Sequence, residues 1–84
     1  IMQEIGDKSG EGAMLNNISQ IYDARGDYKT ALTYLEQSLE INQEIGDKLL
    51  EGTTLNNIST IYSAKGDYKI ALTYLEQSLT IMQE

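Results

Sequence analysis

The apolar residues of the chain recur at helical spacing in two stripes, each of which appears twice. The first stripe steps by three and four positions through Leu15, Ile18 and Tyr22, and it predicts a helix over Ser9–Arg25. The second stripe begins at residue 28 and keeps the same spacing, which predicts a helix over Tyr28–Glu44. Because both stripes return 40 residues later, the pattern predicts four helices in all.

Adjacent Gly and Asp residues separate the apolar stripes. Such pairs stand at residues 26–27, 46–47 and 66–67. Glycine supplies the left-handed conformation that ends a helix, and aspartate is a good N-cap for the helix that follows. Connections this short force neighbouring helices to be antiparallel. The predicted fold class is therefore all-α, built from antiparallel helical hairpins.

The sequence contains an internal repeat. Residues 5–44 align with residues 45–84 without a gap, and 30 of the 40 aligned positions are identical. A period of roughly 20 to 50 residues is typical of solenoids, in which each unit buries its apolar face against its neighbours. We therefore expect an alpha-alpha superhelix in which these two segments are repeats one and two. The motif Ile-Met-Gln-Glu at residues 1–4 recurs at residues 81–84, so we interpret residues 1–4 as the tail of a preceding repeat and residues 1–84 as a fragment of a longer array.

The composition narrows the classes of function. The 84 residues include 13 acidic and 6 basic side chains, for a net charge of −7, and the basic ones are scattered along the chain. Without a cluster of Lys and Arg, neither nucleic acid nor an anionic membrane surface is an expected partner, and a neutral or basic protein or peptide fits better. No apolar run approaches the roughly 18 residues that cross a bilayer. The lack of Cys excludes disulfides and is compatible with a reducing compartment, so we expect a cytoplasmic location.

Neither catalysis nor a cofactor is expected. The chain has no His and no Cys, and its other reactive side chains stand on a surface that repeats, whereas active sites are usually singular. The carboxylates near the turns lack the ligand spacing of a calcium loop, and we interpret them as caps and helix-dipole partners. They are Glu4, Asp7, Glu11, Glu44, Asp47 and Glu51. No metal site is therefore predicted.

Three further features have structural interpretations. The motif Asn-Ile-Ser at residues 17–19 and 57–59 matches a glycosylation sequon, but both copies lie on the packed face of a predicted helix, so we expect no glycan. Tyr34 and Tyr74 lie off the apolar stripe, and we predict that they pack on the helix of the next repeat. Fraying or close helix approach would explain the glycines in the first turn of each first helix. These are Gly10, Gly12 and Gly52.

The spacing of large and small residues resembles the tetratricopeptide repeat. The matching positions in the first copy are Leu15, Ile18, Ser19, Tyr22, Gly26, Tyr28, Ala31, Leu35 and Ser38. Those in the second copy are Leu55, Ile58, Ser59, Tyr62, Gly66, Tyr68, Ala71, Leu75 and Ser78. The chain departs from the family pattern where Leu15, Ser19 and Gln43 replace Trp, Gly and Pro, and its period is 40 residues instead of about 34. The longer period resembles the long-repeat variety, similar to kinesin light chains and Pins-type adaptors, which bind peptides.

This resemblance implies a concave groove lined by the first helix of each repeat. Carried over position by position, the groove consists of Ala13, Asn16, Gln20, Asp23, Thr53, Asn56, Thr60 and Ser63. Asn16 and Asn56 are the foremost candidates, because a side-chain amide both donates and accepts and can satisfy the backbone of an extended peptide. They also replace the lysine that some members use to clamp a C-terminal carboxylate, so that ligand is not expected. The adjacent Asn17 and Asn57 are interpreted as packing between repeats and bonding the neighbouring backbone, with ligand contact as the alternative.

Two functions from different classes follow, and a third stays open. The first is a protein–protein interaction scaffold that binds a peptide or helix of a partner in the groove. The second is a structural spacer or self-assembling array, suggested by an apolar stripe on the last helix that no further helix covers. This stripe consists of Leu72, Leu75, Leu79 and Ile81. The third is a regulatory module of a larger signalling protein.

Overall fold

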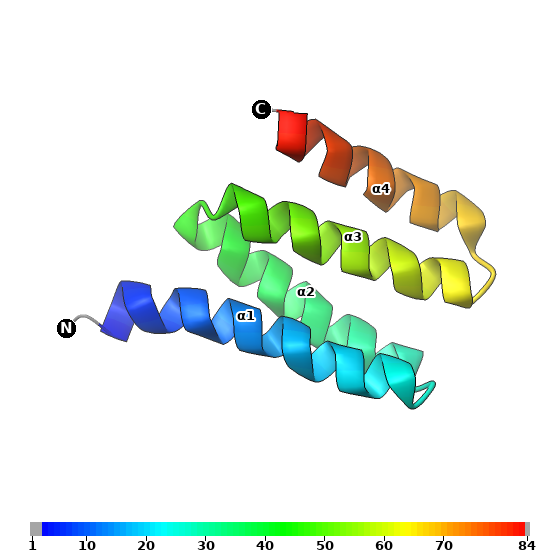
Figure 1. Cartoon of the computed structure of the whole chain (residues 1–84), viewed down its shortest axis with the longest axis horizontal. Helices are drawn as coiled ribbons and strands as arrows, with labels where there is room; N and C mark the ends of the chain where they lie inside the picture. Colours follow the sequence, from blue (N-terminus) through cyan, green and yellow to red (C-terminus); the bar gives the residue numbers. More distant parts are fainter. Residues whose placement is uncertain (1–2, 84) are drawn as a thin grey trace.

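The computed structural model describes residues 3–83, with the side chains of residues 8–83. Four helices follow one another along the chain: α1 (Gln3–Ala24), α2 (Tyr28–Ile45), α3 (Lys48–Ala64) and α4 (Tyr68–Gln83). Figure 1 shows them in chain order, each packed antiparallel against the next, and the described part of the chain contains no strand. The predicted all-α fold of helical hairpins is confirmed. Residues 1–2 and 84, and the side chains of Glu4 and Asp7, lie outside the described residues.

The Gly-Asp pairs form the turns between helices, as predicted. The three turn glycines have positive φ angles of 80° at Gly26, 73° at Gly46 and 82° at Gly66, in the left-handed region where glycine carries no Cβ penalty. Two of the aspartates cap the helix that follows: the Asp27 side chain accepts from the Thr30 amide at 3.3 Å, and the Asp47 side chain accepts from the Leu50 amide at 3.1 Å. Local sequence therefore fixes where each hairpin turns.

The start of α1 differs from the prediction. The tetrapeptide Ile-Gly-Asp-Lys occurs at residues 5–8 and again at residues 45–48. The second occurrence forms the turn between α2 and α3, but the first lies inside α1, which begins at Gln3 and not near Ser9. At residues 45–48 the turn is stabilised because α3 folds back and packs on α2. An internal glycine costs a helix only about 1 kcal/mol, so Gly6 alone does not end α1.

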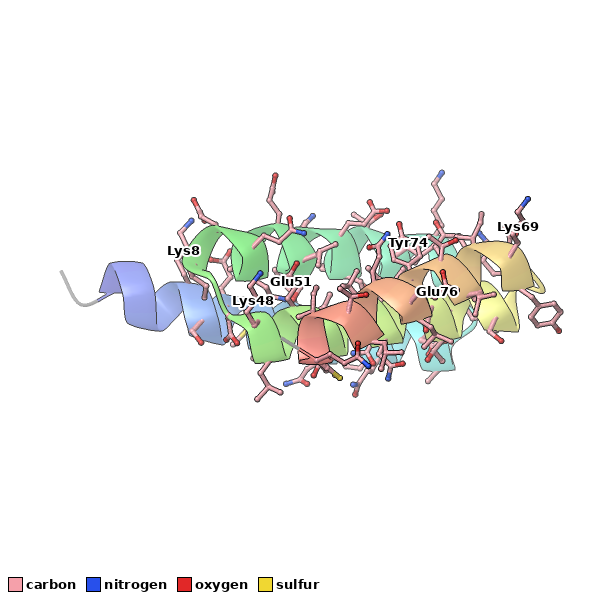
Figure 2. The ribbon with its side chains drawn as sticks, turned by 90° about the horizontal axis from the view of Figure 1, so that it is seen from above. Lys8, Lys48, Glu51, Lys69, Tyr74 and Glu76 are labelled. Carbon is pink, nitrogen blue, oxygen red and sulfur yellow. The ribbon has the colours of Figure 1, made fainter. Side chains whose placement is uncertain are left out.

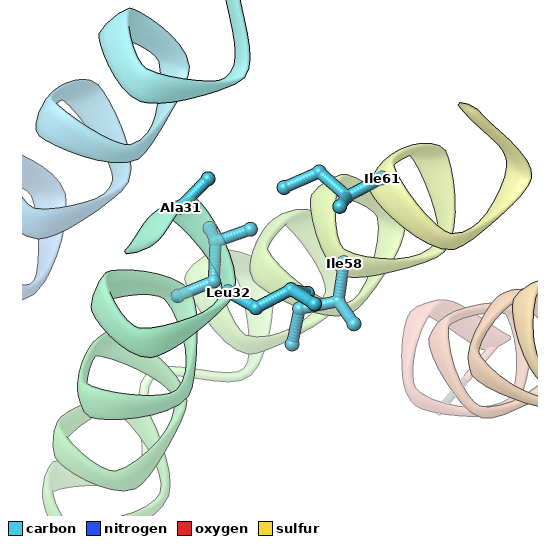
Figure 3. Close-up of a cluster of buried hydrophobic side chains, with 5 residues drawn as sticks. Ala31, Leu32, Ile58 and Ile61 are labelled. Atoms are coloured by element: carbon cyan, nitrogen blue, oxygen red, sulfur yellow. The ribbon is translucent and has the colours of Figure 1, made fainter. Parts of the chain in front are cut away.

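The largest buried cluster lies between the two repeats and not within either one. Figure 3 shows it at the contact between α2 and α3. The buried side chains are Ala31, Leu32, Leu35, Ile58 and Ile61. Leu35 is fully buried and Ile58 and Ile61 are almost so, which places the second repeat's first helix directly on the first repeat's second helix. Each repeat thus depends on its neighbour for apolar burial, as a solenoid requires.

Two buried glycines mark close contact between the helices of each hairpin. A Cβ atom on Gly12 would lie 2.8 Å from Asn42 Oδ1, and one on Gly52 would lie 3.1 Å from Met82 Cε. Of the two explanations for these glycines, close helix approach is therefore correct. A Cβ atom on Gly10 would have no atom within 4 Å, so packing does not require glycine at that position.

The prediction for Tyr34 and Tyr74 was wrong. The Tyr34 ring stacks on Tyr22 with 5.6 Å between ring centroids, and the Tyr74 ring stacks on Tyr62 at 5.7 Å. Each stacked pair joins the two helices of one hairpin, and Tyr74 also packs against the buried cluster between the repeats. The two rings of each pair lie on facing helices of an antiparallel hairpin and are 12 residues apart in the sequence, a spacing that both repeats share.

Candidate functional site

The predicted groove residues all lie on α1 and α3, but their exposure differs. Seven are exposed or half-buried: Ala13, Gln20, Asp23, Thr53, Asn56, Thr60 and Ser63. The eighth, Asn16, is only 4% exposed. Because α1 and α3 contact each other directly, exposed members from the two repeats come together at that contact.

Three groove residues meet where α1 and α3 touch. Gln20 and Asp23 from α1 and Thr60 from α3 line one small cavity of about 40 Å³, with Asn57 at its wall. The Thr60 hydroxyl donates to the Asn56 carbonyl at 3.1 Å and keeps its oxygen lone pairs. The cavity thus presents an amide, a carboxylate and a hydroxyl side by side, which are groups that can bond a peptide backbone or a basic side chain.

A larger groove lies between α3 and α4. It has a volume of about 660 Å³ and joins the predicted residues Asn56, Thr60 and Ser63 to an apolar wall. This wall includes Leu72 and Leu75 of α4, and the other lining residues are Ser59, Ala64, Tyr68 and Ala71. The predicted groove included only residues of the first helix of each repeat, so this wall was not predicted as part of a site. The apolar stripe of the last helix was the feature of the sequence that indicated it.

Asn16 lies behind the groove in a buried polar network. Its Nδ2 donates to Ser38 Oγ at 2.7 Å and to Thr54 Oγ1 at 2.8 Å, and its Oδ1 accepts from Asn57 Nδ2 at 2.9 Å. The amide is therefore fully used in joining the two helices of repeat one to the first helix of repeat two. Asn57 lies between the repeats as its structural interpretation predicted, but it bonds a side chain and not the neighbouring backbone.

Asn42 belongs to the same network and was not singled out from the sequence. Its Nδ2 donates to Thr54 Oγ1 at 2.8 Å, and the side chain is completely buried. Asn42 Oδ1 has no hydrogen-bond partner, so only the Nδ2 atom of this amide is hydrogen-bonded. Asn42 and Thr54 together place a polar contact in the middle of the interface between the repeats.

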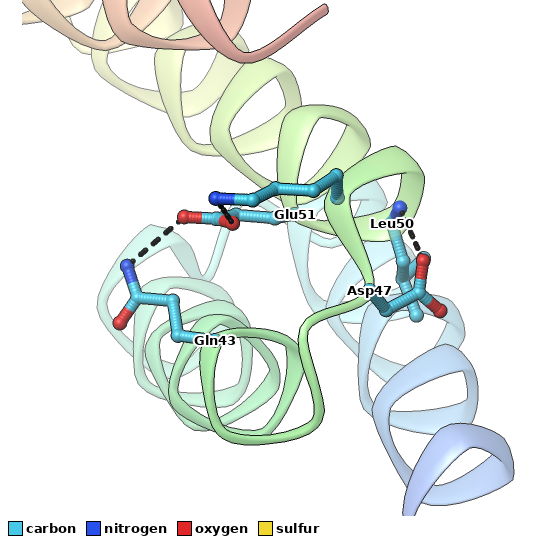
Figure 4. A network of polar contacts seen from close by, with 5 residues as sticks. Gln43, Asp47, Leu50 and Glu51 are labelled. Carbon is cyan, nitrogen blue, oxygen red and sulfur yellow. Dashed lines mark hydrogen bonds and ion pairs between the residues drawn. The ribbon is translucent and has the colours of Figure 1, made fainter. Parts of the chain in front are cut away.

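The polar and charged side chains near the α2–α3 turn are hydrogen-bonded or ion-paired within the chain. Figure 4 shows Gln43 Nε2 donating to Glu51 Oε2 at 3.2 Å, and the Asp47 carboxylate accepting from the Leu50 amide at 3.1 Å. The second oxygen of the buried Glu51 carboxylate faces Lys48 Nζ at 3.9 Å. Within residues 8–83, no cluster of acidic side chains is grouped closely enough to hold a metal ion.

Basic side chains occur at both ends of the molecule. Figure 2 shows Lys8 and Lys48 toward one end and Lys69 at the other. Lys8 Nζ bonds Glu44 Oε1 at 3.1 Å, and this hydrogen bond, with the attraction of the Glu44 charge, raises the pKa of the Lys8 ammonium. Lys8 is therefore engaged within the chain and lies at the opposite end from Lys69.

These features define a helical-hairpin solenoid with an exposed polar stripe on its first helices. A family model described as the tetratricopeptide repeat matches residues 1–84, and the chain belongs to that family. Repeats of this family generally mediate protein–protein interactions. No curated protein and no solved structure matches the chain significantly. None of the helices in residues 3–83 combines the length and apolar character needed to cross a membrane.

Proposed function

We propose that this chain binds a peptide or helix of a protein partner along the exposed faces of α1 and α3. The observation that carries the proposal is the meeting of Gln20, Asp23 and Thr60 at the contact between the two first helices. These side chains come from both repeats, so the surface exists only when the repeats are stacked. A ligand that spans them would bind the array and not a single hairpin.

The chemistry of this surface favours an extended peptide that is neutral or basic. Gln20 both donates and accepts, and can therefore pair with a peptide backbone without reading its side chains. Asp23 adds a negative charge to a chain of net charge −7, which attracts cationic ligands and repels acidic ones. Asn56, Ser63 and Thr53 extend the polar stripe along α3, and the small Ala13 leaves room beside it on α1.

Asn16 has a different role in this proposal. Because its side chain is buried and fully hydrogen-bonded, we leave it out of the ligand-contacting set and assign it to holding α1 against α3. The proposed activity is binding without catalysis, as an adaptor or scaffold of the cytoplasm. The 40-residue period supports grouping the chain with the long-repeat adaptors that resemble kinesin light chains and Pins-type proteins.

A peptide-display selection tests the proposal. The protein is challenged with random peptides, and affinities of the enriched sequences are measured by calorimetry for wild type and for the Gln20→Ala/Thr60→Ala variant. The matched control is Thr33→Ala, which removes the same kind of exposed hydroxyl from α2, where it bonds only the Lys29 carbonyl.

The expected outcome is enrichment of neutral or basic peptides whose affinity falls about tenfold in the double variant and is unchanged in the control, since each lost hydrogen bond is worth about 0.5–1.5 kcal/mol. Enriched peptides that bind both variants as tightly as wild type would place the binding surface elsewhere. Enrichment of acidic peptides would contradict the electrostatic argument.

A further inference from the structure

The small cavity at the contact between α1 and α3 lies inside the described array. Its lining side chains come from α1, α2 and α3. Its inner end is apolar, because Leu35 is fully buried and Ile61 is 2% exposed. Its mouth lies at the surface, because Gln20 and Thr60 are exposed. These three helices form the cavity by themselves, whatever stands before α1 or after α4.

The hydroxyl groups that line the cavity use their hydrogen atoms elsewhere. Ser19 Oγ donates to the Asn16 carbonyl at 2.6 Å, and Thr60 Oγ1 donates to the Asn56 carbonyl at 3.1 Å. A hydroxyl that donates its single hydrogen still accepts through its oxygen lone pairs. Both hydroxyls are therefore acceptors for any group that enters the cavity.

The other polar side chains of the lining are acceptors as well. Asn57 directs its Nδ2 to Asn16 Oδ1 at 2.9 Å, so its own Oδ1 remains to accept. The Asp23 carboxylate only accepts when ionised, and the Gln20 amide can present its oxygen. The cavity thus joins one negative charge to several neutral acceptors, an arrangement that suits a cationic donor.

The Asp23 carboxylate has no cation of its own chain beside it. Neither ion pair among the described side chains includes Asp23. Arg25 stands two residues further along, but its guanidinium lies over the Tyr22 ring, 5.6 Å from the ring centroid. A cation supplied by a ligand would therefore gain a charged partner without displacing one from this chain.

The size of the cavity distinguishes between the cations of proteins. A void of roughly 10–15 Å³ holds one water molecule, so a cavity of about 40 Å³ has room for only a few non-hydrogen atoms. A lysine ammonium is a compact point charge with three donors, whereas the arginine guanidinium is a rigid plane of one carbon and three nitrogens. The ammonium is the better match in both size and number of donors.

We propose that the ligand inserts one lysine side chain into this cavity, where its ammonium group pairs with the Asp23 carboxylate and donates to the Thr60 hydroxyl. The third ammonium hydrogen has an acceptor in the Gln20 amide oxygen. These bonds offset the loss of hydration, and the apolar inner end at Leu35 strengthens the ion pair by lowering the local dielectric constant. This inference rests on the groove function proposed above and names one residue that the ligand carries.

Binding of four pools of short capped peptides tests the proposal. Each pool has random uncharged sequences around one fixed central residue, which is lysine, arginine, acetyl-lysine or norleucine. Fluorescence anisotropy of the labelled pools gives an apparent Kd for each. The lysine pool is expected to bind about tenfold or more tightly than the norleucine and acetyl-lysine pools, the effect of a hydrogen bond between charged groups. The arginine pool should fall between them, because Asp23 attracts its charge but the cavity does not admit its head group.

The outcomes separate this inference from the groove function. Equal binding of the lysine and norleucine pools would overturn the lysine proposal and leave the groove function standing. Arginine binding as tight as lysine binding would overturn it too, because the size of the cavity would then select nothing. If no pool binds, both proposals fail.

Asp23→Asn keeps the shape of the side chain and removes its charge. It is expected to weaken the lysine pool about tenfold and to leave the norleucine pool unchanged. The matched control is Glu40→Gln, which removes the same charge from the exposed face of α2 and should leave both pools as in wild type. Equal weakening in the two variants would mean that net charge and not the cavity attracts lysine, and would overturn the proposal.

A second variant guards against a folding defect at this position. Asp23→Ser introduces the residue that repeat two carries at the equivalent position, Ser63, which stands in a folded helix of the same pattern. Unchanged helical circular dichroism shows that each variant folds. The same loss of lysine preference is expected in both Asp23 variants, and a preference retained in folded Asp23→Ser would overturn the proposal.

Discussion

Ser38 Oγ donates a hydrogen bond to the backbone carbonyl of Gly12 at 2.8 Å, and this bond ties the middle of α2 to α1. The contact is possible because Gly12 has no Cβ to hold the helices apart. Ser78 and Gly52 form the same bond at 2.8 Å in the second hairpin. In each hairpin, therefore, a serine hydroxyl on the second helix donates to the backbone carbonyl of a glycine on the first.

Gly12→Ala is expected to destabilise the protein, because its Cβ would fall 2.8 Å from the buried Asn42 Oδ1. We expect a loss of about 1–3 kcal/mol in the free energy of unfolding, the usual cost of overpacking. Gly10→Ala is the matched control, since that site has open space and should gain about 0.5–1 kcal/mol from helix propensity. Urea unfolding followed by circular dichroism measures both. Equal effects of the two substitutions would contradict the close approach at Gly12.

Ser38→Ala is expected to cost more than Ser78→Ala. Ser38 bonds Gly12 and also accepts from Asn16 Nδ2 at 2.7 Å, whereas Ser78 bonds only Gly52. We expect a loss of about 1–3 kcal/mol at Ser38 and about 1 kcal/mol at Ser78, because the first change removes two short buried hydrogen bonds and the second removes one. Thermal unfolding of both variants gives the comparison. A larger loss at Ser78 would mean that the network around Asn16 adds no stability.

Asn16→Ala and Asn56→Ala are expected to differ although the two residues hold the same place in the repeat. The side chain of Asn16 is buried and takes part in four hydrogen bonds. Its removal also takes away the acceptor of Asn57 Nδ2. We expect a loss of about 1–3 kcal/mol at Asn16 and within about 0.5 kcal/mol at the exposed Asn56. Denaturant unfolding at low protein concentration checks this in monomers. Similar losses at both sites would contradict the buried position of Asn16.

Stability is expected to fall at alkaline pH through Tyr62. Burial raises the pKa of the Tyr62 phenol above its usual 10.0, and the nearby Tyr74, Glu36 and Asp67 add to the rise. The folded state therefore holds this proton more tightly than the unfolded chain does. The resulting stabilisation is fully present below about pH 10 and is lost as the pH rises through the elevated pKa.

Tyr62→Phe removes this titration while keeping the ring. Its free energy of unfolding should decline less than that of wild type above about pH 10, and the difference at neutral pH reports the effect of losing the hydroxyl itself. Unfolding curves at a series of pH values measure the slopes. Parallel declines in the two proteins would show that Tyr62 does not carry the alkaline destabilisation.

The helices and turns could be predicted because their causes are local. A glycine in the left-handed region and an aspartate cap act within a few residues, so the ends of α1 at Ala24 and of α2 at Ile45 fall within one residue of the predicted positions. The start of α1 could not be predicted in this way. The same tetrapeptide is helical at residues 5–8 and a turn at residues 45–48, so the local sequence alone does not decide between the two conformations.

The candidate site was only partly predictable, because the burial of a side chain depends on the neighbouring helices, and the sequence of one repeat does not determine them. Asn16 and Asn56 are identical in sequence context, yet α2 and α3 enclose the first while the second lies open. The apolar wall at Leu72 likewise belongs to a groove only because no described helix covers it. Sequence identity between repeats thus predicts shared structure but not shared exposure.

The stacked tyrosine pair of each hairpin is an intrinsic spectroscopic probe of that hairpin. The chain has no tryptophan and only six tyrosines, and four of these form the pairs Tyr22–Tyr34 and Tyr62–Tyr74, one in each repeat. Coupled phenol transitions of such pairs appear in near-ultraviolet circular dichroism. Replacing one pair by phenylalanine leaves the other hairpin as the main reporter, so the melting of the two halves of this chain can be recorded separately in the same molecule.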